Sequence, residues 1–421
     1  MLFFFKKAKD AATPGAKELQ QAFLALFFTQ LQPDVSISSQ ENFIFVFQAK
    51  RKKLKVVHII EALGGGVYTY FEDLTHHFEK ETIRQKVSTF ILYSDKRKEI
   101  DPQKVAQLFA ALPNKKVAMK REISPISDLK AIQNLIHELQ AIKPDVVHLH
   151  SSKAGVLGRI ACCFLNPKPL VFYTPHGYAF LRTDSSPMAK KTYWYIEKLF
   201  QKIFGGITIA CGDSEFELAK QLGKSEMIRN GINISSIQLY LQPFVNPKLT
   251  IGTTGRITAQ KNPKLFNSIA LQFPNYQFVW VGDGEEREQL TASNIKITGW
   301  FLDKQKIYEH LNSFDIYLQT SLWEGLSIAI LEAMALQKPI VATQIAGNID
   351  LILPNKTGFL FQETSELTEY FKTLEDPKVR SEIGKNAQSR CANLFDTTKN
   401  FTALQALYER YFFAATKDFQ K

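Results

Sequence analysis

The sequence is poor in cysteine. Its 421 residues include four, Cys162, Cys163, Cys211 and Cys391, and no two of them form a C-x-x-C pair. This pattern argues against a disulfide framework or a cysteine-rich zinc site, and a reducing compartment is the simplest interpretation. The sequence also lacks an apolar run of the roughly 18 to 20 residues that span a bilayer, and it lacks a basic N-terminal region followed by a hydrophobic one. We therefore expect a cytoplasmic protein, peripheral at the inner face of a membrane.

A complete dinucleotide-binding fingerprint is also missing. The predicted strand KVVHIIEAL leads into the turn GGGVYT, where Gly64, Gly65 and Gly66 precede Thr69. The fingerprint G-x-G-x-x-G needs glycine where Thr69 stands, which weakens a nicotinamide-binding interpretation. The glycines still let the backbone approach a ligand without Cβ obstruction, although a tight turn alone would also explain them.

Length and composition are those of a globular protein with two domains. Apolar residues make up 45% of the chain and charged residues 22%, as in ordinary soluble domains. The net charge of +11 is unevenly placed: residues 1–245 carry 33 Lys and Arg against 22 Asp and Glu, whereas residues 246–421 carry 19 of each. The first half is therefore the part expected to approach an anionic partner.

The chain is predicted to contain an extension followed by two α/β domains. Strand-like and helix-like segments alternate after the extension, which indicates parallel sheets with functional loops at the carboxyl ends of the strands. The proline-containing segment 241–250 lacks periodicity and suits an interdomain hinge. We predict an extension at 1–53, a first domain at 54–243, a second domain at 244–398, and a helix at 399–421 that crosses back to the first domain.

Two segments combine apolar residues with cations. In the extension, a helical stripe precedes the basic run KRKKLK, a combination found in membrane-surface anchors, although packing on the first domain would also explain it. That stripe consists of Leu19, Ala22, Phe23, Leu26 and Phe27. The segment FLRTDSSPMAKKTYWYIEKLFQKIF could face an acceptor or a membrane, but we expect a helix packed through Trp194, Ile196 and Leu199. Ser214 is expected to cap the next helix.

The stretch at 321–343, SLWEGLSIAILEAMALQKPIVAT, predicts a turn between a buried strand and a helix. Ser327 is placed as the N-cap of that helix. A helix N-terminus after a parallel strand presents unpaired N–H groups and suits a phosphate. Glu324 and Glu332 are anions and cannot bind phosphate, but they can accept hydrogen bonds from hydroxyls of a sugar and a ribose. The ligand these groups describe is a nucleotide diphosphate sugar.

The sequence EGLSIAILE resembles the E-x7-E signature of retaining glycosyltransferases of the GT-B fold, in particular glycosyltransferase family 4. The resemblance implies an α/β fold with two Rossmann-like domains whose parallel sheets face a central cleft. It also implies transfer of a hexosyl group from a nucleotide diphosphate sugar to a hydroxyl of a lipid-linked or polysaccharide acceptor. Bacterial capsule or exopolysaccharide assembly is the setting it suggests.

The same resemblance assigns site residues. Arg256 and Lys261 can neutralise a diphosphate and match the family's GR…K element, while His176 in TPHGY matches a histidine aimed at the donor sugar. Glu324 would hold sugar hydroxyls and Glu332 the ribose. The expected catalytic residues are Arg256, Lys261, Glu324 and His176. The expected donor-binding residues are Glu332, Gly325, Leu326, Ser327, Gly65, Gly66, Gly299 and Trp300, the last two lying where family members hold the base.

No metal or separate cofactor is expected. His148 and His150 in HLHSSK have no third or fourth ligand at a suitable spacing for zinc, and no D-x-D triplet occurs. The expected partners are a nucleotide-sugar donor, UDP- or GDP-linked, a lipid-linked saccharide acceptor and an anionic membrane surface. No nucleic acid is expected to bind.

Three alternatives remain open at this point. A nucleotide-sugar epimerase or a non-catalytic sugar-nucleotide-binding protein could share this two-domain fold. A nicotinamide-dependent oxidoreductase could use the glycine turn, but Thr69 and the charged pairs of the second domain disfavour it.

Overall fold

A computed structural model describes residues 53–96, 101–120, 122, 124–301 and 303–418. The chain divides into two units, Met1–Lys52 and Lys53–Lys421, and the described residues all belong to the second. The predicted amphipathic extension therefore lies outside the described residues. No helix among the described residues has the length and apolar character that crossing a bilayer would require.

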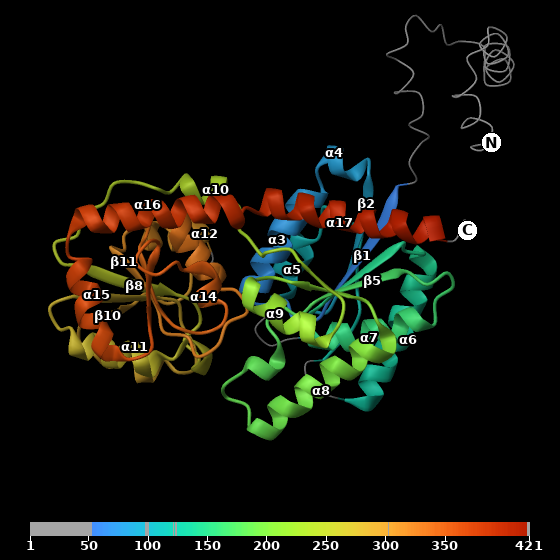
Figure 1. Ribbon diagram of the computed structural model, residues 1–421, viewed down its shortest axis with the longest axis horizontal. Coiled ribbons are helices and arrows are strands. Elements are labelled where there is room, and N and C mark those ends of the chain that lie inside the picture. Colours follow the sequence, from blue (N-terminus) through green and yellow to red (C-terminus); the bar gives the residue numbers. More distant parts are fainter. Residues whose placement is uncertain (1–52, 97–100, 121, 123, 302, 419–421) are drawn as a thin grey trace, which may run out of the picture. The chain divides into compact units, whose positions relative to one another are not determined.

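The first half of the second unit is built on a seven-stranded parallel sheet (Figure 1). Its strand order is β3-β2-β1-β4-β5-β6-β7. Strands β1 and β4 are almost continuously buried, as expected for parallel strands covered on both faces. The strands are β1 Leu54–Ile60, β2 Val87–Tyr93, β3 Asn114–Lys116, β4 Val146–His150, β5 Leu170–Thr174, β6 Ile207–Ala210 and β7 Ser225–Met227.

Helices connect these strands, and several begin where the sequence places a proline after a capping residue. Asp101 and Ser186 accept hydrogen bonds from backbone N–H groups at the starts of α5 and α8. The helices are α3 Gly66–Phe78, α4 Glu81–Arg84, α5 Pro102–Leu108, α6 Pro125–Ile142, α7 Ser151–Cys163, η2 Ala179–Leu181, α8 Pro187–Phe204, α9 Asp213–Leu222 and α10 Ile234–Gln238.

Two local predictions in this half are wrong. Ser214 is not the N-cap of α9, a position that Gly212 occupies, because the Ser214 hydroxyl donates instead to Asp350 at 2.5 Å. Leu199 does not pack α8, since it is 52% exposed. Trp194 does pack against the core of the first half, as predicted. The buried face of α8 also carries polar anchors: Glu197 accepts from the Tyr173 hydroxyl at 2.8 Å, and Gln201 accepts from an arginine of α7 at 2.9 Å.

The second half is built on a six-stranded parallel sheet of order β10-β9-β8-β11-β12-β13. Its strands are β8 Thr250–Thr254, β9 Gln277–Val281, β10 Ile295–Ile297, β11 Ile316–Gln319, β12 Ile340–Thr343 and β13 Gly358–Phe361. Its helices are η3 Ala259–Lys261, α11 Pro263–Gln272, η4 Arg287–Gln289, α12 Lys304–Asn312, α13 Ile328–Ala335, α14 Asn348–Leu351, η5 Thr364–Glu366, α15 Leu367–Thr373, α16 Pro377–Leu394 and α17 Thr397–Asp418.

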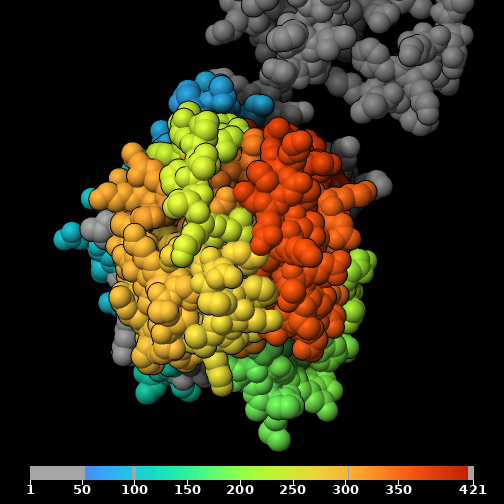
Figure 2. Space-filling model, turned by 90° about the vertical axis from the view of Figure 1, so that its left-hand side faces the viewer, coloured from blue at the N-terminus to red at the C-terminus, as the bar shows by residue number. Residues whose placement is uncertain are grey.

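Aromatic and polar contacts join the outer helices of this half. The ring of Phe273, just after α11, lies edge-on to Phe371 of α15 with centroids 4.9 Å apart. The Tyr276 hydroxyl donates to Glu375 at 2.6 Å. On the surface in Figure 2, the yellow region of α11 accordingly meets the red-orange region of the C-terminal segment.

The last helix contributes to the core of the first half. Phe401, Leu404 and Tyr408 of α17 belong to one hydrophobic cluster with residues of β1 and α3, while α16 packs on α13 of the second half. In Figure 1 the red ribbon of α16 and α17 joins the two halves. The hydroxyl of Tyr408 lies 2.5 Å from His148 Nδ1 of β4, so the helix is tied by a polar contact as well as by packing.

The strand orders place the site. The order reverses between β1 and β4 in the first sheet and between β8 and β11 in the second. In open α/β sheets, ligands bind outside the carboxyl ends of the strands at such a reversal. The loops that follow β1, β5, β8 and β11 carry the glycine turn, His176, the Arg/Lys pair and Glu324. His148 and His150, which were expected in such a loop, lie within β4 itself, and α7 begins directly after it.

Candidate functional site

The turn between β11 and α13 forms as its local sequence predicts. The Ser327 side chain accepts a hydrogen bond from the backbone N–H of Ile330 at 3.4 Å and is the N-cap of α13. The helix ends at Ala335, before Pro339. The capped N-terminus leaves a partial positive charge and N–H groups at the carboxyl edge of the sheet, where a phosphate would be stabilised.

Glu324 is held in one orientation by several donors. Its Oε1 accepts from Lys261 Nζ at 2.8 Å, Ser321 Oγ at 2.8 Å and Gln319 Nε2 at 3.0 Å. Its Oε2 lies 3.3 Å from Gln260 Nε2. A carboxylate with these partners pays little rotational entropy on meeting a ligand, because the protein has already fixed its geometry.

Lys261 and Glu324 therefore form an ion pair, a contact that the separate roles predicted for them did not include. Their side chains are 17% and 9% exposed, so the attraction is only partly screened by water. Burial opposes the charge of Lys261, yet Glu324 beside it keeps the pKa of the lysine above its ordinary value. Lys261 stays a cation, with its ammonium bonded to the Glu324 carboxylate.

Arg256 lies in the same loop, on the exposed side. It is close enough to Lys261 for its charge to act on the lysine. The two cations predicted to meet a diphosphate are therefore neighbours in space, and Arg256 is the more exposed of the two.

Glu332 is the fifth residue of α13 and lies beside residues of α12 and α3. Tyr308 Oη lies 3.4 Å from Glu332 Oε1. Burial raises the pKa of Glu332, and the nearby ammonium of Lys304 opposes that shift. Lys304 in turn bonds Glu72 of α3, so this group of charges joins the two halves of the chain.

A cavity of about 200 Å³ lies beside this group. Asp73 is the most perturbed acid there: burial raises its pKa to about 7, and its Oδ2 has no hydrogen-bond partner among the described residues. The cavity is lined by Thr69, Glu72, Asp73, His76, Ile232, Asn233, Ser236, Ile237, Lys304 and Tyr308. The sequence interpretation did not include Lys304, Tyr308 or Asp73, because no local motif connects them with Glu332.

His176 follows β5 in a left-handed conformation, with φ of 54°. Such a backbone is uncommon outside glycine and is often retained at functional sites. Its Nε2 lies 3.0 Å from His150 Nδ1, and the Tyr70 ring packs edge-on at 4.8 Å between centroids. Burial lowers the pKa of His176 to about 3, so the ring is neutral at physiological pH.

The loops that carry His176 and Glu324 touch through two glycines. A Cβ added to Gly325 would lie 2.9 Å from the Gly177 Cα and 3.0 Å from the carbonyl oxygen of His176. Gly325 is thus required for close packing of the two loops, in addition to any role of its N–H group. This contact brings the turn of His176 in the first half against the turn of Glu324 in the second.

The remaining predicted residues do not share one set of contacts. Gly65 precedes α3 with φ of 55°, and an added Cβ at Gly66 would meet Ile328 of α13 at 2.9 Å. Leu326 is buried in the core of the second half. Gly299 has φ of 75°, and Trp300 next to it is 55% exposed.

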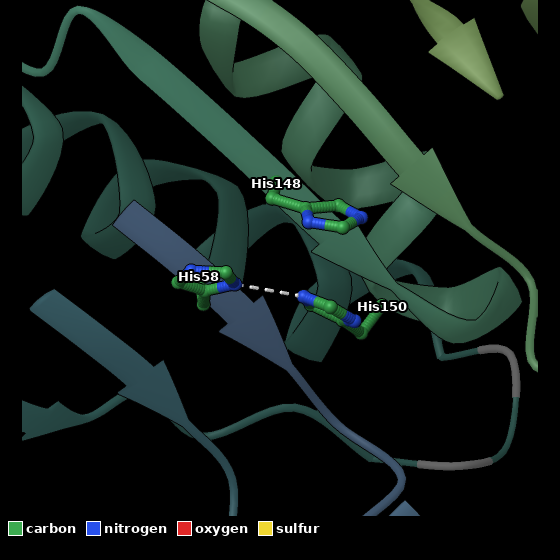
Figure 3. A group of neighbouring side chains, drawn as sticks. All are labelled: His58, His148 and His150. Carbon is green, nitrogen blue, oxygen red and sulfur yellow. Dashed lines mark hydrogen bonds between the residues drawn. The ribbon is translucent and has the colours of Figure 1, made fainter. Parts of the chain in front are cut away.

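A buried group of histidines lies behind His176, and the sequence interpretation missed its third member. His58 of β1 joins His148 and His150 of β4 (Figure 3), and their ring nitrogens lie within 4.8 Å of one another. Spacing along the sequence offers no third nitrogen beside His148 and His150, and the fold brings one from β1. The cause is strand register, which pairs His58 with His148 and cannot be read from spacing within one strand.

Both halves match described families. Residues 64–236 match the family model "Glycosyltransferase Family 4", and residues 242–390 match "Glycosyl transferases group 1". Among curated relatives, an Escherichia coli UDP-Gal:alpha-D-GlcNAc-diphosphoundecaprenol alpha-1,3-galactosyltransferase is 31% identical over 319 residues, covering 68% of this chain and 81% of that protein. A Staphylococcus aureus capsular polysaccharide biosynthesis glycosyltransferase is 25% identical, covering 70% of this chain and 84% of that protein.

Solved structures share the fold. A sucrose-phosphate synthase from Thermosynechococcus elongatus superposes with a TM-score of 0.69 at 16% identity, covering 86% of this chain and all of that one. An Anabaena protein, HepE, solved in complex with UDP-glucose, superposes with a TM-score of 0.67 at 19% identity, covering 85% of this chain and all of that one.

Proposed function

Because the chain belongs to glycosyltransferase family 4, we propose that it transfers a hexosyl group from a nucleotide diphosphate sugar to a hydroxyl of a lipid-linked saccharide, with retention at the anomeric carbon. Membership makes the protein a glycosyltransferase, and the predicted GT-B architecture is confirmed by the two parallel sheets and the matching solved structures. The observation that carries the proposal is the fixed Glu324 carboxylate, bonded to Lys261 and placed just before the capped N-terminus of α13.

The second half supplies the groups suited to the leaving diphosphate. As the bond between the anomeric carbon and the phosphate oxygen breaks, negative charge develops on that oxygen. Arg256, Lys261 and the N–H groups at the start of α13 are positive groups at one edge of the sheet, and such preorganised groups lower the free energy of a transition state in which charge appears.

The carboxylates then have different tasks. Glu324 accepts hydrogen bonds from hydroxyls of the transferred sugar, with its geometry held by Ser321 and Gln319. Glu332 accepts from the ribose, next to Tyr308. We assign no carboxylate as a covalent nucleophile: the acceptor oxygen attacks the face from which the diphosphate leaves, and a phosphate oxygen takes the acceptor proton. No metal or separate cofactor takes part in this proposal.

The acceptor is proposed from the relatives and from the surface of the first half. The Escherichia coli relative is named for a diphosphoundecaprenol-linked acceptor. On α8, the exposed residues Met188, Tyr195, Leu199 and Ile203 recur at spacings that place them on one helix face. Lys191, Lys198 and Lys202 flank that face and are exposed. An apolar face edged with lysines suits an anionic membrane surface, where a lipid-linked acceptor would be met.

The donor is tested by thermal unfolding of the purified protein with UDP- and GDP-sugars, and with nicotinamide dinucleotides as a contrast. We expect one nucleotide sugar to raise the unfolding midpoint, and a smaller shift in Glu332→Ala. Stabilisation by nicotinamide dinucleotides alone would contradict the proposal.

The reaction is tested by incubating the stabilising nucleotide sugar with a diphosphoprenol-linked saccharide. We expect NMR to show a new linkage with the anomeric configuration of the donor. An inverted linkage, or an altered sugar formed without acceptor, would overturn the mechanism.

The membrane surface is tested by flotation with vesicles. We expect binding to vesicles containing anionic lipid and weaker binding to neutral ones. Leu199→Glu combined with Ile203→Glu should reduce binding, whereas Glu217→Gln on the exposed side of α9 should not. Equal binding of the double variant and the wild type would remove α8 from the proposal.

A further inference from the structure

Three histidine rings form a continuous hydrogen-bonded chain from the core of the first half to the site. His58 Nδ1 lies 3.0 Å from His150 Nε2, and His150 Nδ1 lies 3.0 Å from His176 Nε2. His58 and His150 are fully buried, while His176 is partly exposed. Figure 3 shows the inner bond of the chain, between β1 and β4. The chain therefore has a closed end at His58 and an open end at His176.

Each ring in this chain is neutral, which fixes how the protons can be arranged. Burial lowers the pKa of His58 and of His176 to about 3 and that of His150 well below its ordinary value. A neutral imidazole has one N–H group and one bare nitrogen. Because each link needs one of each, all three N–H groups must point in the same direction, either outward to the site or inward to His58.

The closed end distinguishes the two directions. His58 Nε2 has no hydrogen-bond partner among the described residues. Its ring packs against the rings of Phe71, Phe78, His148 and Tyr408, besides that of His150. The inward direction would leave a buried N–H group unsatisfied there, whereas the outward direction leaves only a bare nitrogen. Unsatisfied buried N–H groups are rarer in proteins than under-satisfied acceptors, so the outward direction is favoured.

At the open end, the outward direction puts a hydrogen on His176 Nδ1. This atom lies 3.5 Å from the side-chain nitrogen of Asn230, at the outer limit of a hydrogen bond. An amide rotated by 180° would present its oxygen instead, since the two ends of an amide are nearly equal in shape. The contact is long enough that Nδ1 keeps the capacity to bond a ligand oxygen.

We infer that His150 is a positioning residue, which together with His58 holds His176 in the tautomer that donates a hydrogen bond from Nδ1 to an oxygen of the bound sugar. The identity of that oxygen rests on the proposed function, but the tautomer does not. The inference explains why a strained turn after β5 is tied to a buried polar chain. A hydrogen-bond donor at this point favours a sugar oxygen with a free lone pair. The Glu324 carboxylate, in contrast, favours a sugar hydroxyl that donates its hydrogen.

A metal ion is the competing explanation of the buried histidines. Zinc would need bare nitrogens at about 2.0 to 2.1 Å. Both nitrogens of His148 are already engaged, at 2.5 Å from the Tyr408 hydroxyl and 2.8 Å from Thr174 Oγ1. Both nitrogens of His150 lie within the chain. The hydrogen-bond pattern accounts for these four atoms without a cation.

The test is nitrogen NMR of the full-length protein labelled with ¹⁵N-histidine, which separates protonated from bare ring nitrogens. The His176 signals are assigned by their loss in His176→Gln. We expect His176 to have a protonated Nδ1 and a bare Nε2 when no nucleotide sugar is bound. A protonated Nε2, or one equivalent of zinc in the purified protein, would overturn the inference. The expected tautomer without any sugar transfer would contradict the proposed function alone.

Two variants of similar size sharpen the test. His150→Leu removes the donor to His176 Nε2, so both tautomers should be populated and kcat should fall about threefold, less than the loss expected when His176 itself is removed. His150→Asn keeps an N–H group near the former Nδ1 and should restore both the single tautomer and a kcat near that of the wild type. Identical His176 spectra in the two variants would contradict a positioning role.

Discussion

The two halves of the molecule contribute to the site in opposite ways. Residues 1–245, which include the first half, carry the whole net positive charge of the sequence, yet the first half brings to the site a neutral histidine chain and glycine turns. The second half has equal numbers of acidic and basic residues, yet it holds Arg256, the Lys261–Glu324 pair and the capped helix end. Net charge therefore does not reveal which half binds an anionic substrate, because a few fixed charges decide the local field.

If the second half supplies the charges used in catalysis, Lys261→Met should give the largest effect. Losing this cation should lower kcat about a hundredfold, or about 3 kcal/mol of transition-state stabilisation. Steady-state kinetics would measure this, with Lys264→Met as the control, since Lys264 is an exposed lysine of the same segment. A comparable loss of kcat in both variants would mean that the total positive charge of this segment matters and that the Lys261–Glu324 ion pair does not.

Glu332 should act on binding and less on chemistry. In Glu332→Ala we expect donor affinity by calorimetry to fall by tens of fold, because a hydrogen bond to a charged group contributes about 1.5 to 3 kcal/mol. The turnover at saturating donor should change much less, since ribose contacts exist before the transition state. Glu309→Ala, at an exposed position of α12, is the matched control. Unchanged affinity in Glu332→Ala would remove it from the nucleotide site.

The first half should contribute a smaller, neutral interaction. His176→Leu should lower kcat/KM about tenfold, as for a single uncharged hydrogen bond. The exposed His137 of α6 provides the control variant His137→Leu. A loss as large as that of Lys261→Met would break the contrast between the two halves.

The smallest effect concerns stability at the junction of the halves. Burial raises the pKa of Asp73 to about 7, so the folded protein binds this proton more tightly than the unfolded chain. Its contribution to stability is present at low pH and is lost as the pH rises from about 4 to 7. At pH 8, Asp73→Asn should therefore unfold at a higher temperature than the wild type, with a free energy of unfolding larger by on the order of 1 kcal/mol. At pH 4 the two proteins should differ little. An equal difference in free energy of unfolding at both pH values would contradict the raised pKa of Asp73.

Much of the second half was predictable because its signals are local. Three local signals define the segment from Gln319 to Pro339. They are a turn after an apolar strand, a serine whose side chain accepts a hydrogen bond from the N–H group three residues on, and a proline after the helix. The same holds for the parallel sheets, which follow from alternating strands and helices. The N-cap predicted at Ser214 was wrong because the Ser214 hydroxyl bonds Asp350, which lies 136 residues away and which no local pattern connects with it.

The sequence by itself determined the elements, their order and the residue types available to the site, because these depend on neighbours within a turn or a strand. Only the tertiary structure decided that Lys261 pairs with Glu324, 63 residues on, and that His58 meets His150, 92 residues on. The pairing of β8 with β11 brings the loops of Lys261 and Glu324 together, and the register of β1 against β4 brings His58 near His150. Register and close approach depend on how all the strands and loops pack together, which no local pattern records.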